Sequence, residues 1–198
     1  GDGTADNTMT FSGTITNINT AIATLTWTSA ADDHTNAVLT ILSNDGDDTD
    51  SDTVAITVNS VNDVPVNTVS GAVSGNEDTA ISIATNSIAD ADHTSLTAVT
   101  ISSTQSGTFS LVGVSGLTFA AGDGTADNTM TFSGTVANIN TAIATLTWTS
   151  ATDEDTDAVL TILSNDGDDT DSDTVAITVN SVNDAPVNTV SSAVSGNE

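Results

Sequence analysis

The residues best suited to chemistry are carboxylates gathered in short polar segments. The densest segment runs from Asn44 to Asp52, and the same nine residues return at 165–173. Calcium takes about six to eight oxygen ligands from carboxylates and from amide or backbone carbonyls, so both segments carry the right ligand types. The candidate ligands in this acidic loop are Asp48, Asp50, Asp52, Asp169, Asp171 and Asp173.

The first three of these acids are spaced like the opening of an EF-hand loop, but the motif is not completed. Its sixth position, which requires glycine, is Thr53, and its closing glutamate position is Asn59. An EF-hand is therefore excluded. Two interpretations stay open for each segment: a solvated acidic turn, or a calcium loop of low affinity.

The composition excludes several kinds of partner. The chain has 198 residues with 27 acids, no lysine, no arginine and no cysteine, and its net charge is −27. Without basic side chains it cannot neutralise phosphates, so neither nucleic acid nor an anionic membrane is an expected partner. No apolar run approaches the roughly 20 residues of a membrane span, so membrane insertion is not expected. Disulfides and thiolate chemistry are excluded.

The segments that carry these acids belong to two nearly identical copies within the sequence. Residues 1–77 match residues 122–198 at a constant offset of 121, with 8 differences. A period this long indicates a whole domain in each repeat. The segments 61–66 and 182–187 hold the only prolines and are the best linkers, because proline cannot donate to a central strand ladder. The predicted boundaries are 1–63 for the C-terminal part of one repeat, 64–184 for a complete repeat and 185–198 for the start of the next.

Threonine alternates with apolar residues through most of the chain, which is typical of half-buried strands. Between Ile15 and Leu25 the apolar residues recur at helical spacing instead, with Asn17 as a candidate cap, and the copy predicts a helix at 138–144. The sequence therefore predicts an all-β fold: an antiparallel β-sandwich, immunoglobulin- or cadherin-like, in tandem repeats of 121 residues with one short helix each. Strands are expected at 67–73, 79–84, 95–103, 108–113, 117–120, 128–133, 145–149, 157–164 and 173–181. Trp148, Phe119, Phe132 and Ile143 are expected in the core.

Two stretches carry a resemblance to a known family. The run from Asp52 to Val66, followed by Gly75-Asn-Glu77-Asp78-Thr-Ala, and the run 118–134 are similar to the tandem cadherin-like repeats of giant bacterial RTX-type surface adhesins. The resemblance implies a secreted protein of the bacterial cell surface that binds calcium. It also implies a spacer role, with neighbouring repeats of the same chain as its partners.

The resemblance implies particular calcium ligands. In cadherin-like proteins, Ca²⁺ lies between domains, held by linker Asn/Asp, by a glutamate early in the preceding domain and by an Asp-x-Asp in the following one. Ser60 and Val64 depart from the animal linker, so one or two ions are expected at each junction. The implied ligands are Asn62, Asp63, Asp90 and Asp92 at one junction and Glu77, Asp78, Asn183 and Asp184 at the next, with Glu198 as the repeat of Glu77.

The predicted function is that of a structural extender, or stalk, stiffened by calcium at the junctions between domains. Near-identical adjacent copies favour a spacer, because recognition and catalytic domains usually occur once beside different neighbours. Two alternatives stay open: a glycan-, ice- or surface-binding module of the same adhesin, and a subunit of an extracellular filament or sheath formed by lateral self-assembly. No catalytic residues and no enzyme are expected, since His34 is replaced by Asp155 in the second copy and only His93 is left for a Ser-His-Asp arrangement.

Overall fold

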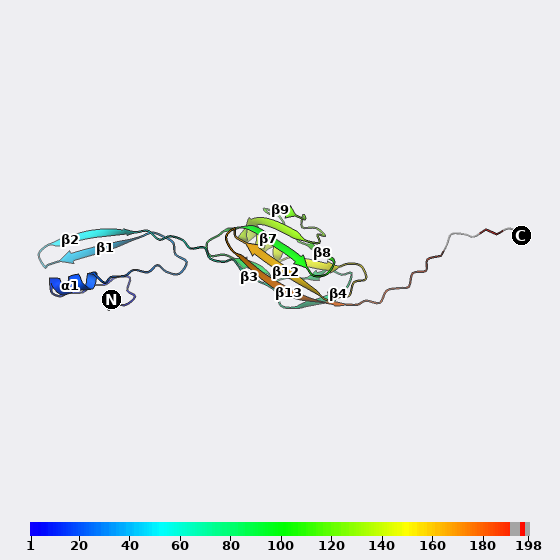
Figure 1. The fold of residues 1–198 in the computed structure, drawn as a ribbon, viewed down its shortest axis with the longest axis horizontal. Helices are drawn as coiled ribbons and strands as arrows, with labels where there is room; N and C mark the ends of the chain where they lie inside the picture. Colours follow the sequence, from blue (N-terminus) through cyan, green and yellow to red (C-terminus); the bar gives the residue numbers. More distant parts are fainter. Residues whose placement is uncertain (191–194, 197–198) are drawn as a thin grey trace. The chain divides into compact units, whose positions relative to one another are not determined.

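The computed structural model describes residues 1–190 and 195–196, which fall into two units, Gly1–Ser60 and Val61–Glu198. The chain is mostly strand, with two short helices among the described residues, so the all-β prediction is confirmed at this level (Figure 1). The division falls between Ser60 and Val61, which assigns the linker residues Asn62 and Asp63 to the second unit. The predicted ligand Glu198 lies outside the described residues.

The first unit consists of one helix and one hairpin. Helix α1 (Ile15–Ile22) precedes β1 (Ala37–Asn44) and β2 (Thr49–Ile56), which pair antiparallel. None of residues 1–60 is buried, and the side chain of Trp27 is 47% exposed. This unit therefore has no hydrophobic core of its own.

The second unit contains three sheets. The six-stranded sheet has the order β4-β13-β12-β7-β10-β9, the three-stranded sheet has the order β5-β11-β8, and β3 pairs with β6. All these pairs are antiparallel except β4 with β13, which is parallel. The elements are β3 (Val66–Thr68), β4 (Val73–Asn76), β5 (Ile81–Ser82), β6 (Ser87–Ala89), β7 (Ser95–Ser103), β8 (Gly107–Ser110), β9 (Thr118–Ala121), β10 (Met130–Thr135), α2 (Val136–Ile143), β11 (Thr147–Ser150), β12 (Ala158–Asn165) and β13 (Thr170–Asn180).

One hydrophobic core joins the two larger sheets and α2. Residues of β12 alternate between buried and more exposed positions, as expected of a strand, with Val159, Thr161 and Leu163 on the more exposed face. Trp148, Phe132 and Ile143 are buried, which confirms their predicted place in the core. Phe119 is only partly buried and packs against this core, with its ring centroid 5.4 Å from that of Phe132.

Two local predictions are wrong. Asn17 does not cap α1, because the side chain of Thr14 occupies that position and accepts a hydrogen bond from the backbone N–H of Asn17 at 3.3 Å. The expected strand 67–73 is divided into β3 and β4, and β6 was not predicted. Strand β6 holds a single strongly apolar residue, Ile88, in a polar stretch, so it gives no alternating pattern.

Candidate metal site

Two turns of the second unit bring acids close to the linker. The turn between β6 and β7 carries Asp90, Asp92 and His93, and the turn between β12 and β13 begins at Asp166. Oδ1 of Asp90 accepts the backbone N–H of Asp92 at 2.9 Å and that of His93 at 2.7 Å. These two hydrogen bonds stabilise the turn and fix the orientation of the Asp90 carboxylate. The Asp90 side chain is fully buried.

The linker is hydrogen-bonded to both turns. Nδ2 of Asn62 donates to Oδ2 of Asp166 and to Oδ2 of Asp169, each at 3.1 Å. The backbone N–H of Asp63 donates to Oδ2 of Asp92 at 2.6 Å. The structure therefore brings Asp63 to the turn that holds Asp90 and Asp92, and Asn62 to the turn that begins at Asp166. Their role as calcium ligands stays a prediction.

Asp166 belongs to this cluster, although the sequence did not single it out. Asp166 is a buried residue. Its Oδ1 accepts the backbone N–H groups of Asp168 and Asp169, both at 2.7 Å. The N–H of Asp169 contributes most to lowering the pKa of Asp166; burial opposes this, and Asp168, Asn62 and His93 add to it. The available signal was the Asp-Gly pair, because Gly167 adopts φ 122° in this turn.

The acids of the predicted acidic loop lie partly in strands. Asp171 and Asp173 lie within β13, and the equivalent Asp50 and Asp52 lie within β2, while calcium binding by this segment stays a prediction. Only the first acid of each predicted triplet lies in the turn itself, at Asp48 and Asp169. Oδ2 of Asp171 accepts the backbone N–H of Asn67 at 2.7 Å, which ties β13 to β3.

Several buried polar atoms at this place have no hydrogen-bond partner. In the described part of the chain, six buried side-chain atoms have no hydrogen-bond partner. Three of them are Oδ1 of Asn62, Oδ2 of Asp90 and Nδ1 of His93. Buried polar atoms are satisfied in the great majority of cases, so three of them in adjoining residues indicate a missing partner. With no lysine or arginine in the chain, that partner is not a basic side chain.

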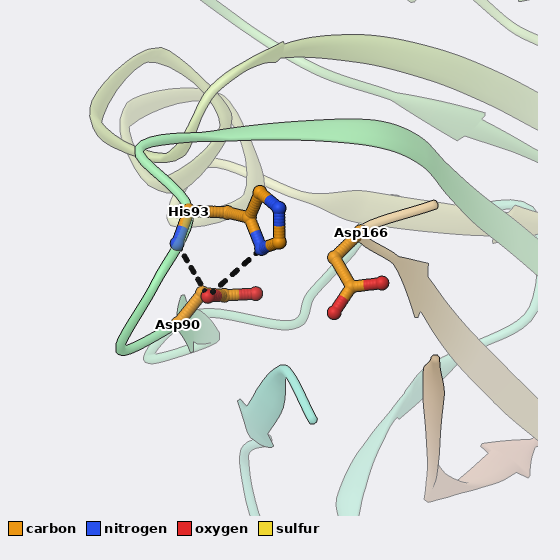
Figure 2. A group of neighbouring side chains, drawn as sticks. All are labelled: Asp90, His93 and Asp166. Carbon is orange, nitrogen blue, oxygen red and sulfur yellow. Dashed lines mark hydrogen bonds and ion pairs between the residues drawn. The ribbon is translucent and has the colours of Figure 1, made fainter. Parts of the chain in front are cut away.

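Figure 2 shows the imidazole of His93 and the carboxylates of Asp90 and Asp166 turned toward a common space. One ligand atom from each of these three residues lies within 4.8 Å of the other two. Two carboxylates and a ring nitrogen at this separation are suited to holding a divalent cation, which would also neutralise the buried Asp90.

A second acidic group contains the predicted residues Asp78 and Asp184, while the predicted Glu77 makes a separate contact. Oε1 of the buried Glu77 accepts the backbone N–H of Val182 at 2.6 Å. The carboxylates of Asp78, Asp153 and Asp184 lie within 4.8 Å of one another and are exposed. Asp153 was not predicted, and the predicted Asn183 donates through Nδ2 to the carbonyl oxygen of Asp184 at 3.2 Å.

No protein-family model matches the chain, and no curated protein is significantly similar to it. Among the described residues, no helix has the length and apolar character needed to cross a membrane.

Proposed function

We propose that the chain is a structural extender of a large secreted bacterial adhesin, built from tandem immunoglobulin- or cadherin-like sandwich repeats. Its place is the extracellular surface of the bacterial cell, and its partners are the neighbouring repeats. The internal repetition supports this proposal, as do two sheets that share one core. The observation that carries it is the attachment of Asp63 to the turn that holds a buried, unpartnered carboxylate oxygen of Asp90, together with the attachment of Asn62 to the turn of Asp166.

Calcium suits the donor set at this attachment. Calcium is a hard cation that prefers carboxylate and amide oxygens. Oδ2 of Asp90 and Oδ1 of Asn62 are buried and unpartnered, while Asp92, Asp166 and Asp169 supply carboxylates that already contact the linker. These residues would hold the ion, which would supply positive charge and join the linker to the repeat that follows it.

The ion's effect on mechanics follows from charge. A net charge of −27 opposes compact structure through self-repulsion. A cation bound only by the folded state stabilises it by about 2.7 kcal/mol at a hundredfold excess over Kd. A linker held at both Asn62 and Asp63 loses hinge freedom, so each bound ion stiffens the chain as well as stabilising a repeat.

The test combines calorimetry and X-ray scattering on the full chain with calcium or with chelator. We expect calcium to raise Tm and to increase the maximum particle dimension, and Asp90→Ala with Asp92→Ala to abolish both effects. The matched control is Asp33→Ala with Asp155→Ala, which removes the same charge from exposed positions that are not candidate ligands. If calcium-loaded and chelated samples melt and scatter alike, the proposal is wrong.

A further inference from the structure

We infer that Asp90, His93 and Asp166 form a site for a first-row transition-metal dication, with Nδ1 of His93 as a nitrogen ligand. The inference deepens the proposed function and rests on it in part, because Asp90 and Asp166 also belong to the oxygen set assigned to calcium. What it adds is the imidazole, which a site built only for calcium does not need.

The position of His93 is the first argument. The side chain is 36% exposed as a whole, yet its Nδ1 atom is buried and has no hydrogen-bond partner. The ring is therefore inserted by its Nδ1 edge, beside the two carboxylates (Figure 2). A histidine that served only as a polar surface residue would keep this nitrogen in water or hydrogen-bond it to a neighbour.

Asp90 provides the second, independent argument. Its Oδ1 is already engaged by two backbone N–H groups, whereas its Oδ2 is buried and unpartnered. A fully buried carboxylate with one oxygen unsatisfied is costly unless a cation completes it. The orphan oxygen and the orphan nitrogen belong to residues only three apart in the same turn, so one ion can complete both.

An ion pair between His93 and Asp90 does not account for these orphans. Nδ1 lies 3.5 Å from Oδ1 of Asp90, whereas charged N–H···O bonds measure about 2.7–2.9 Å. Such a pair would also engage Oδ1, which already accepts two bonds, and would leave Oδ2 unsatisfied. A metal ion accounts for both atoms.

The ligand types select the metal. Imidazole nitrogen is a ligand of zinc, copper, nickel and iron, while calcium and magnesium take oxygen. At about 2.1 Å from a tetrahedral ion, ligand atoms lie about 3.4 Å apart. One ligand atom from each of Asp90, His93 and Asp166 lies within 4.8 Å of the other two, so a bound ion would draw these atoms closer together by at most about 1.4 Å.

The experiment titrates Zn²⁺ into the chelator-washed full chain and follows the imidazole C–H signals by NMR together with calorimetry. The chain has two histidines, so His34→Ala assigns the signals and serves as the matched control. We expect the ring signals of His93 to shift and saturate while those of His34 stay in place. We expect His93→Ala and His93→Gln to weaken Zn²⁺ binding at least about tenfold, since even supporting residues of metal sites cost that much. Calcium affinity should change less than about threefold.

Each other outcome has a definite meaning. If the His93 signals do not move, or if both histidines respond alike, the nitrogen ligand is refuted and zinc binds only to surface acids. Zinc binding by both His93 variants as tight as in the wild type refutes it equally. Calcium stabilisation without a His93 response overturns this inference alone, whereas a saturating His93 response without any calcium effect overturns the calcium proposal alone. Fluorescence of the buried Trp148 verifies that each variant is folded.

Discussion

Replacing Asp90 with asparagine should have an effect on stability that depends on calcium. In the wild type, Oδ1 of Asp90 accepts two backbone N–H groups and Oδ2 is buried without a partner. Asparagine keeps an oxygen at the Oδ1 position and places a neutral amide where the unpaired charged oxygen stood. The substitution therefore preserves the turn and removes the charge that a cation would bind.

The magnitude follows from three contributions. Two hydrogen bonds to a charged acceptor become bonds to a neutral one, which costs about 1 kcal/mol each. Against this, the variant replaces an unsatisfied buried charged oxygen with an unsatisfied neutral amide, whose burial costs about 1–3 kcal/mol less than that of the charge. Without calcium the variant and the wild type should unfold within about 1 kcal/mol of each other. With calcium at a hundredfold excess over Kd, the wild type gains about 2.7 kcal/mol and the variant gains little of it.

The assay is urea unfolding followed by Trp148 fluorescence, in a Trp27→Phe background that removes the half-exposed tryptophan of the first unit. Each protein is measured with EDTA and with saturating calcium. We expect a difference of about 2–3 kcal/mol between the effects of Asp90→Asn in the two conditions. A loss that is equally large in EDTA and in calcium would show that Asp90 only stabilises its turn, and the reasoning would fail.

Three further outcomes follow from the structure. The pKa of Asp166 is lowered in the folded state, so its ionised form stabilises the fold above the ordinary pKa of about 3.9, and this stability is lost as pH falls through the folded-state pKa. In chelator, Asp166→Asn should therefore destabilise the protein at pH 7 and lose that effect below about pH 4. Urea midpoints measured across pH would show this. Trp148→Ala should cost about 3–5 kcal/mol in urea unfolding because the side chain is fully buried, whereas Trp27→Ala should cost less than about 1. Joining a copy of residues 61–121 ahead of residue 1 should bury Trp27 and shift its fluorescence to shorter wavelength, and an unchanged spectrum would contradict the pairing seen in the second unit.

The strands and the core were predictable where the pattern is regular. The predicted strands 95–103 and 157–164 match β7 and β12 to within one residue, and Trp148 was correctly expected inside. The pattern did not give β6, because a three-residue strand with one apolar side chain has no period to detect. Its existence depends on pairing with β3, which is a tertiary contact.

The site was predictable only in part, for a similar reason. The resemblance to cadherin-like repeats placed Asn62 and Asp63 with Asp90 and Asp92. In the structure Asp63 contacts Asp92 beside Asp90, whereas Asn62 contacts the turn of Asp166. It gave no reason to include Asp166, which is 76 positions from Asp90 in the sequence and reaches it through the pairing of β12 with β7. Single acids among 27 carry no such information in the sequence.

The two near-copies separate what the local sequence determines from what the complete repeat adds. The hairpins β1–β2 and β12–β13 have the same register, and Asp45 accepts the N–H groups of Asp47 and Asp48 as Asp166 does those of its own turn. The turn carboxylate is therefore positioned by the hairpin alone, with or without a core.

Asp90 and His93 come from residues 64–121, for which residues 1–60 hold no equivalent. The proposed cation site at the Asp166 turn therefore needs residues 64–121 as well as the hairpin, and the Asp45 turn has the same local geometry without these two ligands. Because the acids of the isolated hairpin are exposed, they carry no buried charge that an ion must satisfy. We therefore expect a cation to bind at the Asp166 turn in preference to the Asp45 turn, because of burial and of the added ligands and not because of the acidic sequence itself.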